Sequence, residues 1–124
     1  MSDAPYLAVV VAHYRLPANQ RALAAPTHRY EGTNPLCGDR LRMEVVLDDE
    51  RLMDVAFQSS ACAIATASAS LLTMRLRGAR LADVDALDDR AVIAALGAGV
   101  PAGRHPCATL PIRVLRRALG MPVA

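Results

Sequence analysis

The sequence predicts an α+β fold, in which a small antiparallel β-sheet of about three strands carries helices packed on one side. Residues 40–58 alternate apolar and polar side chains on both sides of a polar turn at 48–50, as a β-hairpin does. From residue 62 onward the pattern changes to segments of helical length. With 124 residues, the chain is expected to form one domain over residues 1–124 around a single core.

Three elements are expected before the hairpin. Residues 5–15 form an apolar run of helical length, and Pro17 is expected to end this helix because proline cannot continue it. Residues 17–27 contain prolines and an asparagine and are expected to form a loop. Residues 28–33 are expected to form an edge strand, and a turn cluster at 34–39 leads into the hairpin.

One set of alternating apolar side chains in the hairpin is expected to face the core. This set is Leu41, Met43, Val45 and Leu47 on the first strand, and Met53, Val55 and Phe57 on the second. Residues 62–77 then have helical length and no helix breaker, and short helices are expected at 81–87 and 88–96. The last helix is expected from about residue 108 to 119, with Pro111 in its first turn.

Composition excludes several classes of function. All 14 basic residues are arginine, so a Schiff base, a P-loop lysine or a lysine general base is excluded. A net charge of +2 with 3% aromatic residues argues against binding of single-stranded nucleic acid. No apolar run approaches the length of a membrane span, and the N-terminus does not resemble a signal peptide. A cytoplasmic protein without membrane or nucleic-acid partners is therefore expected.

The three cysteines are expected at the ends of elements. Cys37 lies in the turn before the hairpin, Cys62 at the start of a helix and Cys107 just before the last helix. Helix N-termini favour the thiolate, which is both a soft metal ligand and a sulfur nucleophile. Together with Asp39, three thiolates would form a tetrahedral site for Zn²⁺ or a labile site for iron. The alternative is that these cysteines only fill space in the core, as free cysteines often do.

The segments around the cysteines resemble a known family. The motifs NPLCGD at 34–39, SSACAIATASAS at 59–70 and RHPCATL at 104–110 resemble the three cysteine motifs of the IscU/SufU/NifU N-terminal iron–sulfur cluster assembly scaffolds. The resemblance covers almost the whole chain and implies a SufE/NifU-like α+β fold. It also implies a site made of Cys37, Asp39, Cys62 and Cys107.

Within this family the chain resembles SufU most closely. Arg104 stands three residues before Cys107, and Cys-Ala-Thr-Leu follows, as in SufU-type proteins. The insertion that SufU proteins usually carry between the second and third cysteines is absent here. Arg104 is expected to be an auxiliary residue of the site. His105 is either a further metal ligand or a solvent-facing loop histidine.

The resemblance implies a scaffold or sulfur acceptor rather than an enzyme, including a sulfurtransferase-like role. Such a protein accepts sulfur from a cysteine desulfurase, with Cys37 or Cys107 as the sulfur acceptor. It holds a zinc ion, or iron as a nascent [2Fe–2S] cluster, and passes its product to downstream cluster-assembly or acceptor proteins.

Two other classes of function are compatible with the residues. A structural zinc module that mediates interactions would keep the metal and accept no sulfur. A thiol enzyme would use Cys62 with a histidine base, but no signature pairs Cys62 with His13, His28 or His105.

Overall fold

The computed structural model describes residues 6–35 and 38–123, and the statements below concern these residues. Its sheet has the order β1-β2-β3, and neighbouring strands are antiparallel. The strands are β1 (His28–Asn34), β2 (Asp39–Asp48) and β3 (Arg51–Ser60). The helices are α1 (Tyr6–Arg15), α2 (Ala63–Leu76), α3 (Leu81–Ala86), α4 (Asp89–Leu96) and α5 (His105–Ala118), with a 3-10 turn at Ala102–Arg104.

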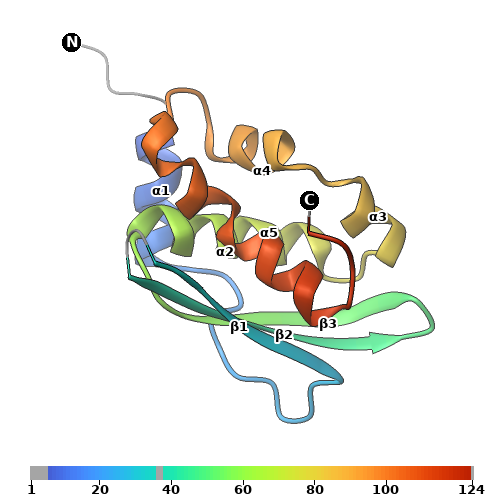
Figure 1. The fold of residues 1–124 in the computed structure, drawn as a ribbon. Helices are drawn as coiled ribbons and strands as arrows, with labels where there is room; N and C mark the ends of the chain where they lie inside the picture. Colours follow the sequence, from blue (N-terminus) through green and yellow to red (C-terminus); the bar gives the residue numbers. More distant parts are fainter. Residues whose placement is uncertain (1–5, 36–37, 124) are drawn as a thin grey trace.

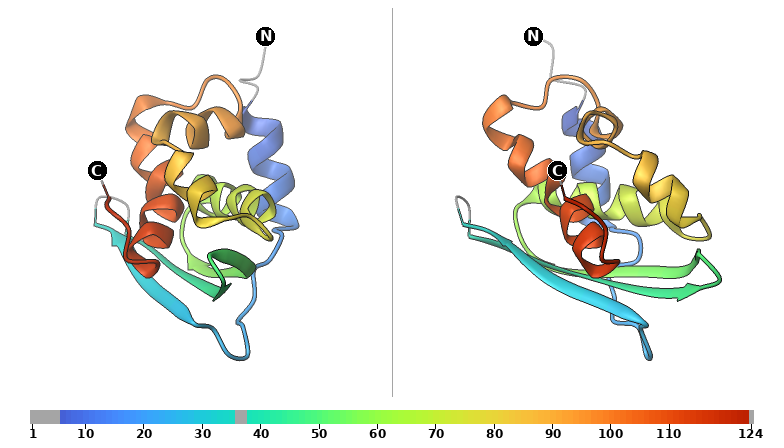
Figure 2. Two further views of the ribbon diagram at one scale, coloured as in Figure 1. Left: turned by 90° about the vertical axis from the view of Figure 1, so that its right-hand side faces the viewer. Right: turned by 45° about the vertical axis from the view of Figure 1, so that its right-hand side comes forward.

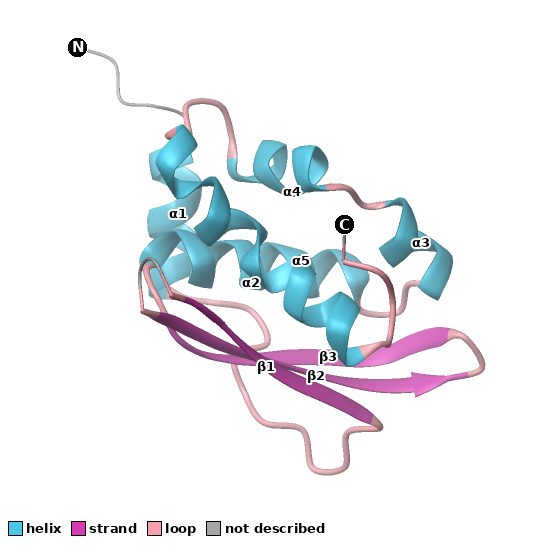
Figure 3. Ribbon diagram, viewed as in Figure 1, coloured by secondary structure: helices cyan, strands magenta, loops and turns pink. Residues whose placement is uncertain are grey.

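The helices cover one face of the sheet, so the predicted α+β architecture is confirmed (Figure 1). α2 and α5 lie against the sheet, and α1 and α4 pack on α2 (Figure 3). The buried apolar side chains of this layer form the main core, which includes Leu41, Met43, Val45, Val55, Phe57, Leu72, Ile112 and Leu115. No described helix has the length and the apolar character needed to cross a membrane.

The hairpin between β2 and β3 has a two-residue turn. Asp48 pairs with Arg51, and Asp49 and Glu50 between them have φ values of 50° and 63°. Two consecutive residues with positive φ form the turn whose twist matches that of the flanking strands. The polar turn predicted at 48–50 is therefore confirmed.

The expectation that Met53 faces the core is wrong. The register shifts between Val46 and Leu47, because Val46 pairs with Asp54 whereas Leu47 pairs with Leu52. Met53 is the extra residue of this β-bulge and is 52% exposed, while Leu52 is fully buried in its place. A bulge reverses the alternation on one side of the extra residue, so the period of two does not extend through it.

The loop at 16–27 partly covers the second face of the sheet (Figure 2). Its backbone pairs along the free edge of β3, where the Phe57 N–H donates to the Asn19 carbonyl at 3.0 Å. It then crosses below β2, where the Leu23 N–H donates to Glu44 Oε1 at 2.9 Å. Glu44 is only 3% exposed as a result, although its position in the alternating pattern indicates the solvent side.

α5 begins at His105, three residues earlier than predicted. Pro106 lies in its first turn, where the missing N–H has no helical acceptor, and Pro111 lies inside the helix. Cys107 therefore belongs to the first turn of α5 rather than to the residues before it. A Cβ on Gly32 of β1 would lie 2.6 Å from Val114 Cγ2, so this glycine permits the close approach of α5 to the strand.

Candidate metal centre

Asp39 is the first residue of β2 and is 3% exposed. Its Oδ1 accepts a hydrogen bond of 2.9 Å from the backbone N–H of Cys62. Its Oδ2 is buried and accepts no hydrogen bond from any residue that the structure describes. A buried carboxylate oxygen without a donor is unfavourable, and a bound cation would relieve this cost.

Cys62 is the N-cap residue of α2. Its backbone is extended, and its Sγ accepts a hydrogen bond from the Ala65 N–H at 3.5 Å. The side chain is half-buried and forms no disulfide. The Thr66 N–H donates to the Cys62 carbonyl at 3.0 Å. The first turn of α2 therefore holds Cys62 through both its backbone and its sulfur.

Cys107 lies in the first turn of α5 and is fully buried. The Asn34 side chain at the end of β1 donates from Nδ2 to Cys107 Sγ, at 3.8 Å. At the next residue, the Ser68 hydroxyl donates to the Ala108 carbonyl at 2.6 Å and joins α2 to α5. These contacts fix the start of α5 against both the sheet and α2.

The ligand atoms of Asp39, Cys62 and Cys107 all lie within 4.8 Å of one another. One carboxylate and two thiols from three separate elements thus meet at one end of the sheet. This donor set suits zinc or iron, because both accept soft thiolate ligands together with a carboxylate oxygen. The structure therefore brings together three of the four predicted site residues. Cys37 lies outside the described residues, and its part in the site stays a prediction.

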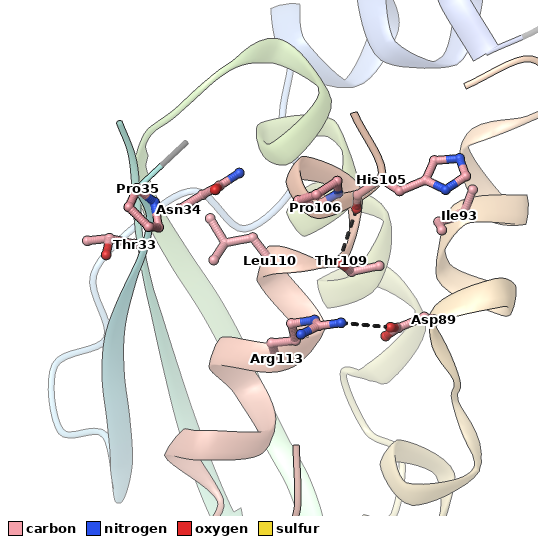
Figure 4. A pocket seen from close by; sticks show the side chains of 10 residues that line it. All are labelled: Thr33, Asn34, Pro35, Asp89, Ile93, His105, Pro106, Thr109, Leu110 and Arg113. Atoms are coloured by element: carbon pink, nitrogen blue, oxygen red, sulfur yellow. Dashed lines mark hydrogen bonds and ion pairs between the residues drawn. The ribbon is translucent and has the colours of Figure 1, made fainter. Parts of the chain in front are cut away.

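The structure does not bring His105 into this group. Its Nε2 hydrogen-bonds to the Val100 carbonyl at 3.2 Å, and its ring points toward Ile93 on α4 and away from Asn34 (Figure 4). Arg104 precedes α5 as its N-cap residue and is exposed. Whether either residue acts at the site stays a prediction.

A hollow of about 510 Å³ lies between β1, α4 and α5 (Figure 4). Its lining includes Asn34, which contacts Cys107, and Pro106, which precedes Cys107 in the chain. An ion pair of 3.0 Å between Arg113 and Asp89 also lines it. Asn34 is the residue that sequence reasoning missed. Its position in the motif that contains Cys37 and Asp39 is the signal that could have identified it.

The histidines have partners other than Cys62. His13 Nδ1 bonds to the Ser70 hydroxyl at 2.8 Å, His28 Nδ1 to the Thr27 hydroxyl at 2.9 Å, and His105 to a backbone carbonyl. A thiol enzyme that pairs Cys62 with a histidine base therefore finds no support in this arrangement.

The three-stranded sheet, its single helical layer and the thiol and carboxylate group define a small α+β domain with a metal-site donor set. Residues 5–121 match the model of the NifU-like N terminal domain, and the chain belongs to this family. The resemblance predicted from the three cysteine motifs is thereby confirmed.

Relatives with curated names include two kinds of protein. The zinc-dependent sulfurtransferase SufU of Bacillus subtilis (strain 168) is 36% identical over 76 residues, which cover 61% of this chain and 51% of that protein. The iron–sulfur cluster assembly scaffold protein IscU 1 of Archaeoglobus fulgidus is 35% identical over 86 residues, which cover 69% of this chain and 56% of that protein. The chain thus spans about half the length of these curated relatives.

A solved structure has the same fold. The N-terminal part of a nitrogen-fixing NifU-like protein from Brucella abortus superposes with a TM-score of 0.78, at 18% identity. The match covers 94% of this chain and 92% of that one. At this identity the likeness shows the fold alone.

Proposed function

We propose that this protein is an iron–sulfur cluster assembly protein of one domain over residues 1–124. It accepts sulfur from a cysteine desulfurase and holds a zinc ion or a nascent [2Fe–2S] cluster on Cys37, Asp39, Cys62 and Cys107. The observation that carries the proposal is the group of Asp39, Cys62 and Cys107, whose ligand atoms lie within 4.8 Å of one another. Within this group the buried Asp39 Oδ2 has no described donor. The names of the relatives, a zinc-dependent sulfurtransferase and a cluster scaffold, support the two halves of this proposal.

The residues of the site fit such a metal. A bound zinc ion would keep its cysteine ligands as thiolates and satisfy the buried carboxylate oxygen. On the protein side, Asp39 holds the backbone of Cys62 through Oδ1, and its buried Oδ2 has no described donor. A carboxylate ligand is harder than a thiolate, so a cluster on this site is expected to be released more readily than one on four cysteines.

Sulfur transfer is a single exchange reaction between a thiolate and a persulfide. The thiolate of Cys37 or Cys107 attacks the outer sulfur of the desulfurase persulfide, and a new sulfur–sulfur bond forms. The bond to the desulfurase cysteine breaks, and that cysteine leaves as a thiolate. Cys107 is fully buried, so transfer to it requires its neighbours to move, which distinguishes it from a more accessible acceptor.

The partners that this function requires are a cysteine desulfurase and the downstream proteins that complete or accept the cluster. We place these encounters in the cytoplasm, without nucleic acid or membrane. The role is that of a scaffold and sulfur acceptor rather than of an enzyme with a free small-molecule product, and a sulfurtransferase-like activity is part of it.

A structural zinc module is the second candidate. The observation that favours it is that the site ties three elements together, β2 through Asp39, α2 through Cys62 and α5 through Cys107. A metal in this position would cross-link them and stabilise the fold. Such a module would bind zinc and would not accept sulfur.

The deciding experiment treats the purified protein with a cysteine desulfurase and cysteine, and then measures the intact mass. A sulfur acceptor gains about 32 Da per transferred sulfur, as a persulfide. Cys37→Ser and Cys107→Ser are expected to reduce this adduct, and Cys62→Ser serves as the matched control. Zinc, iron and acid-labile sulfide are measured on anaerobically purified protein in parallel. A zinc-bound protein without a sulfur adduct would favour the structural module, and a protein with neither would refute both.

A further inference from the structure

The last residue pair of the β1–β2 ladder contacts both described cysteines. Asn34 ends β1 and pairs with Asp39, which begins β2. The two side chains are 6% and 3% exposed. Asp39 Oδ1 accepts from the backbone of Cys62, and Asn34 Nδ2 donates to the sulfur of Cys107. Cys62 at the start of α2 and Cys107 at the start of α5 are therefore each held by one buried polar side chain, and both of these side chains come from the same end of the sheet.

We propose that Asn34 is a positioning residue of the metal centre. Its carboxamide N–H orients the Cys107 sulfur toward Asp39 and Cys62, and it reduces the electron donation of that sulfur to a bound metal. The inference rests on the proposed function, because it concerns a metal ion held by Cys107.

The chemistry of the two groups supports this assignment. A thiolate can only accept hydrogen bonds, so the carboxamide presents its NH₂ rather than its oxygen to the sulfur. Thiolates and a carboxylate around one divalent ion leave excess negative charge in a buried place. A neutral N–H donor offsets part of this charge, as hydrogen bonds to ligand sulfurs do in iron–sulfur proteins.

The two described sulfurs receive different donors. Cys62 Sγ accepts from the backbone N–H of Ala65, which no substitution removes except proline. Cys107 Sγ accepts from a side chain that lies 73 positions away in the chain. A substitution of Asn34 can therefore change the electron donation of the Cys107 sulfur while all the metal ligands themselves are kept.

The packing around Asn34 makes its position well defined. Two residues earlier, Gly32 lets β1 approach α5 so closely that an added Cβ would lie 2.6 Å from Val114 Cγ2. The following residue, Pro35, restricts Asn34 to extended backbone conformations. The donor is thus carried on a strand end that is packed against the helix bearing its acceptor, as a positioning group requires.

The test uses Co(II) as the probe, because its absorption reports both the number of thiolate ligands and the coordination geometry. The sulfur-to-cobalt charge-transfer bands are compared for the wild type, Asn34→Leu and Asn34→Asp. Both variants preserve the approximate shape of the side chain and remove the donor, and only Asn34→Asp adds charge. Asn19→Asp is the matched control, because Asn19 also donates from Nδ2, to the Thr73 hydroxyl at 3.2 Å, and is not among the metal-site residues.

Both Asn34 variants are expected to shift the charge-transfer bands to lower energy, since a thiolate without the hydrogen bond gives up an electron more readily. Their ligand-field bands should remain in the tetrahedral range, and their cobalt affinity should fall by roughly 10- to 100-fold. Asn19→Asp should match the wild type in all three respects. If Asn34→Leu does not fold, the band position of Asn34→Asp decides the question.

Unchanged charge-transfer bands in a variant that binds one cobalt ion would overturn the proposal. A loss of affinity without a band shift would also overturn it, because that result assigns Asn34 a structural role only. A wild type that shows no thiolate charge-transfer bands would instead refute the proposed function itself. The two failures are therefore distinguishable in the same titration.

Discussion

Replacing Asp39 by asparagine separates the two roles of its carboxylate. Asparagine keeps an oxygen that can accept from the Cys62 N–H, at 2.9 Å in the wild type. It replaces the buried Oδ2, which has no described donor, by an amide NH₂, and we expect the sulfurs of the same group to accept its hydrogen bonds. The variant therefore retains the structural hydrogen bond and loses the anionic ligand.

Compared with the wild type, Asp39→Asn is expected to be at least as stable without metal and less stable with zinc. An unsatisfied buried polar atom costs about 1–3 kcal/mol, so metal-free Asp39→Asn should equal or exceed the wild type in stability by up to that amount. Zinc at a hundredfold excess over its Kd should stabilise the wild type by about 2.7 kcal/mol. The variant should gain much less, because one of its ligands is no longer anionic.

Thermal unfolding followed by circular dichroism, with EDTA and with zinc, measures both changes. For a domain of this size a change of 1 kcal/mol corresponds to roughly 4 °C in Tm. Asp39→Ala is the companion variant, since it also removes the bond to Cys62 and should lower the metal-free stability. A metal-free Asp39→Asn protein that is clearly less stable than the wild type would refute the reasoning about Oδ2. Equal stabilisation of both proteins by zinc would refute the assignment of Asp39 as a ligand.

Three further predictions concern packing, hydrogen bonding and strand register, and are checked by urea unfolding. Gly32→Ala should destabilise the fold by about 1–3 kcal/mol through overpacking, and Val114→Ala should recover part of this loss; additive losses would contradict the proposed contact. Arg116→Met should reduce stability by about 1–3 kcal/mol, because Arg116 Nη2 donates to three carbonyls at the end of α3; an unchanged midpoint would show these bonds to be dispensable. Met53→Lys should change stability by less than about 0.5 kcal/mol, whereas Leu52→Lys should prevent folding. A larger loss from Met53→Lys than from Leu52→Lys would contradict the bulge at Met53.

The local elements of this fold could be predicted because their signals are local. The hairpin follows from alternation on both sides of a polar turn, and α2 follows from an uninterrupted run that Gly78 ends in a left-handed conformation, with φ of 85°. The bulge at Met53 could not be predicted, because an extra residue in one strand is defined only relative to its partner. The start of α5 was misplaced for a related reason, since two prolines in one segment each fit a first turn and tertiary packing selects Pro106.

The candidate site divides in the same way. Asp39, Cys62 and Cys107 could be identified because each stands at the expected end of an element, where functional groups gather. Asn34 has a weaker signal, since its partner is 73 positions away and its polar side chain looks like an ordinary turn residue. Only its position in the motif of Cys37 and Asp39 points to it. Glu44 was likewise expected on an exposed face, and the crossing of the 16–27 loop below the sheet covers it.

The geometry of the centre links its stability to its proposed role. Asp39 and Asn34 form the last pair of one strand ladder, and each reaches the start of a different helix. A metal bound by Asp39, Cys62 and Cys107 would therefore add to connections between the sheet and the two helix starts that the protein already makes in part without it. Asp39 Oδ1 and the Asn34 amide bind protein groups rather than the metal. The starts of α2 and α5 are therefore expected to stay in place when the metal is released. A scaffold that must release its cluster needs this property, whereas a purely structural zinc module would be expected to depend on its metal for the same contacts.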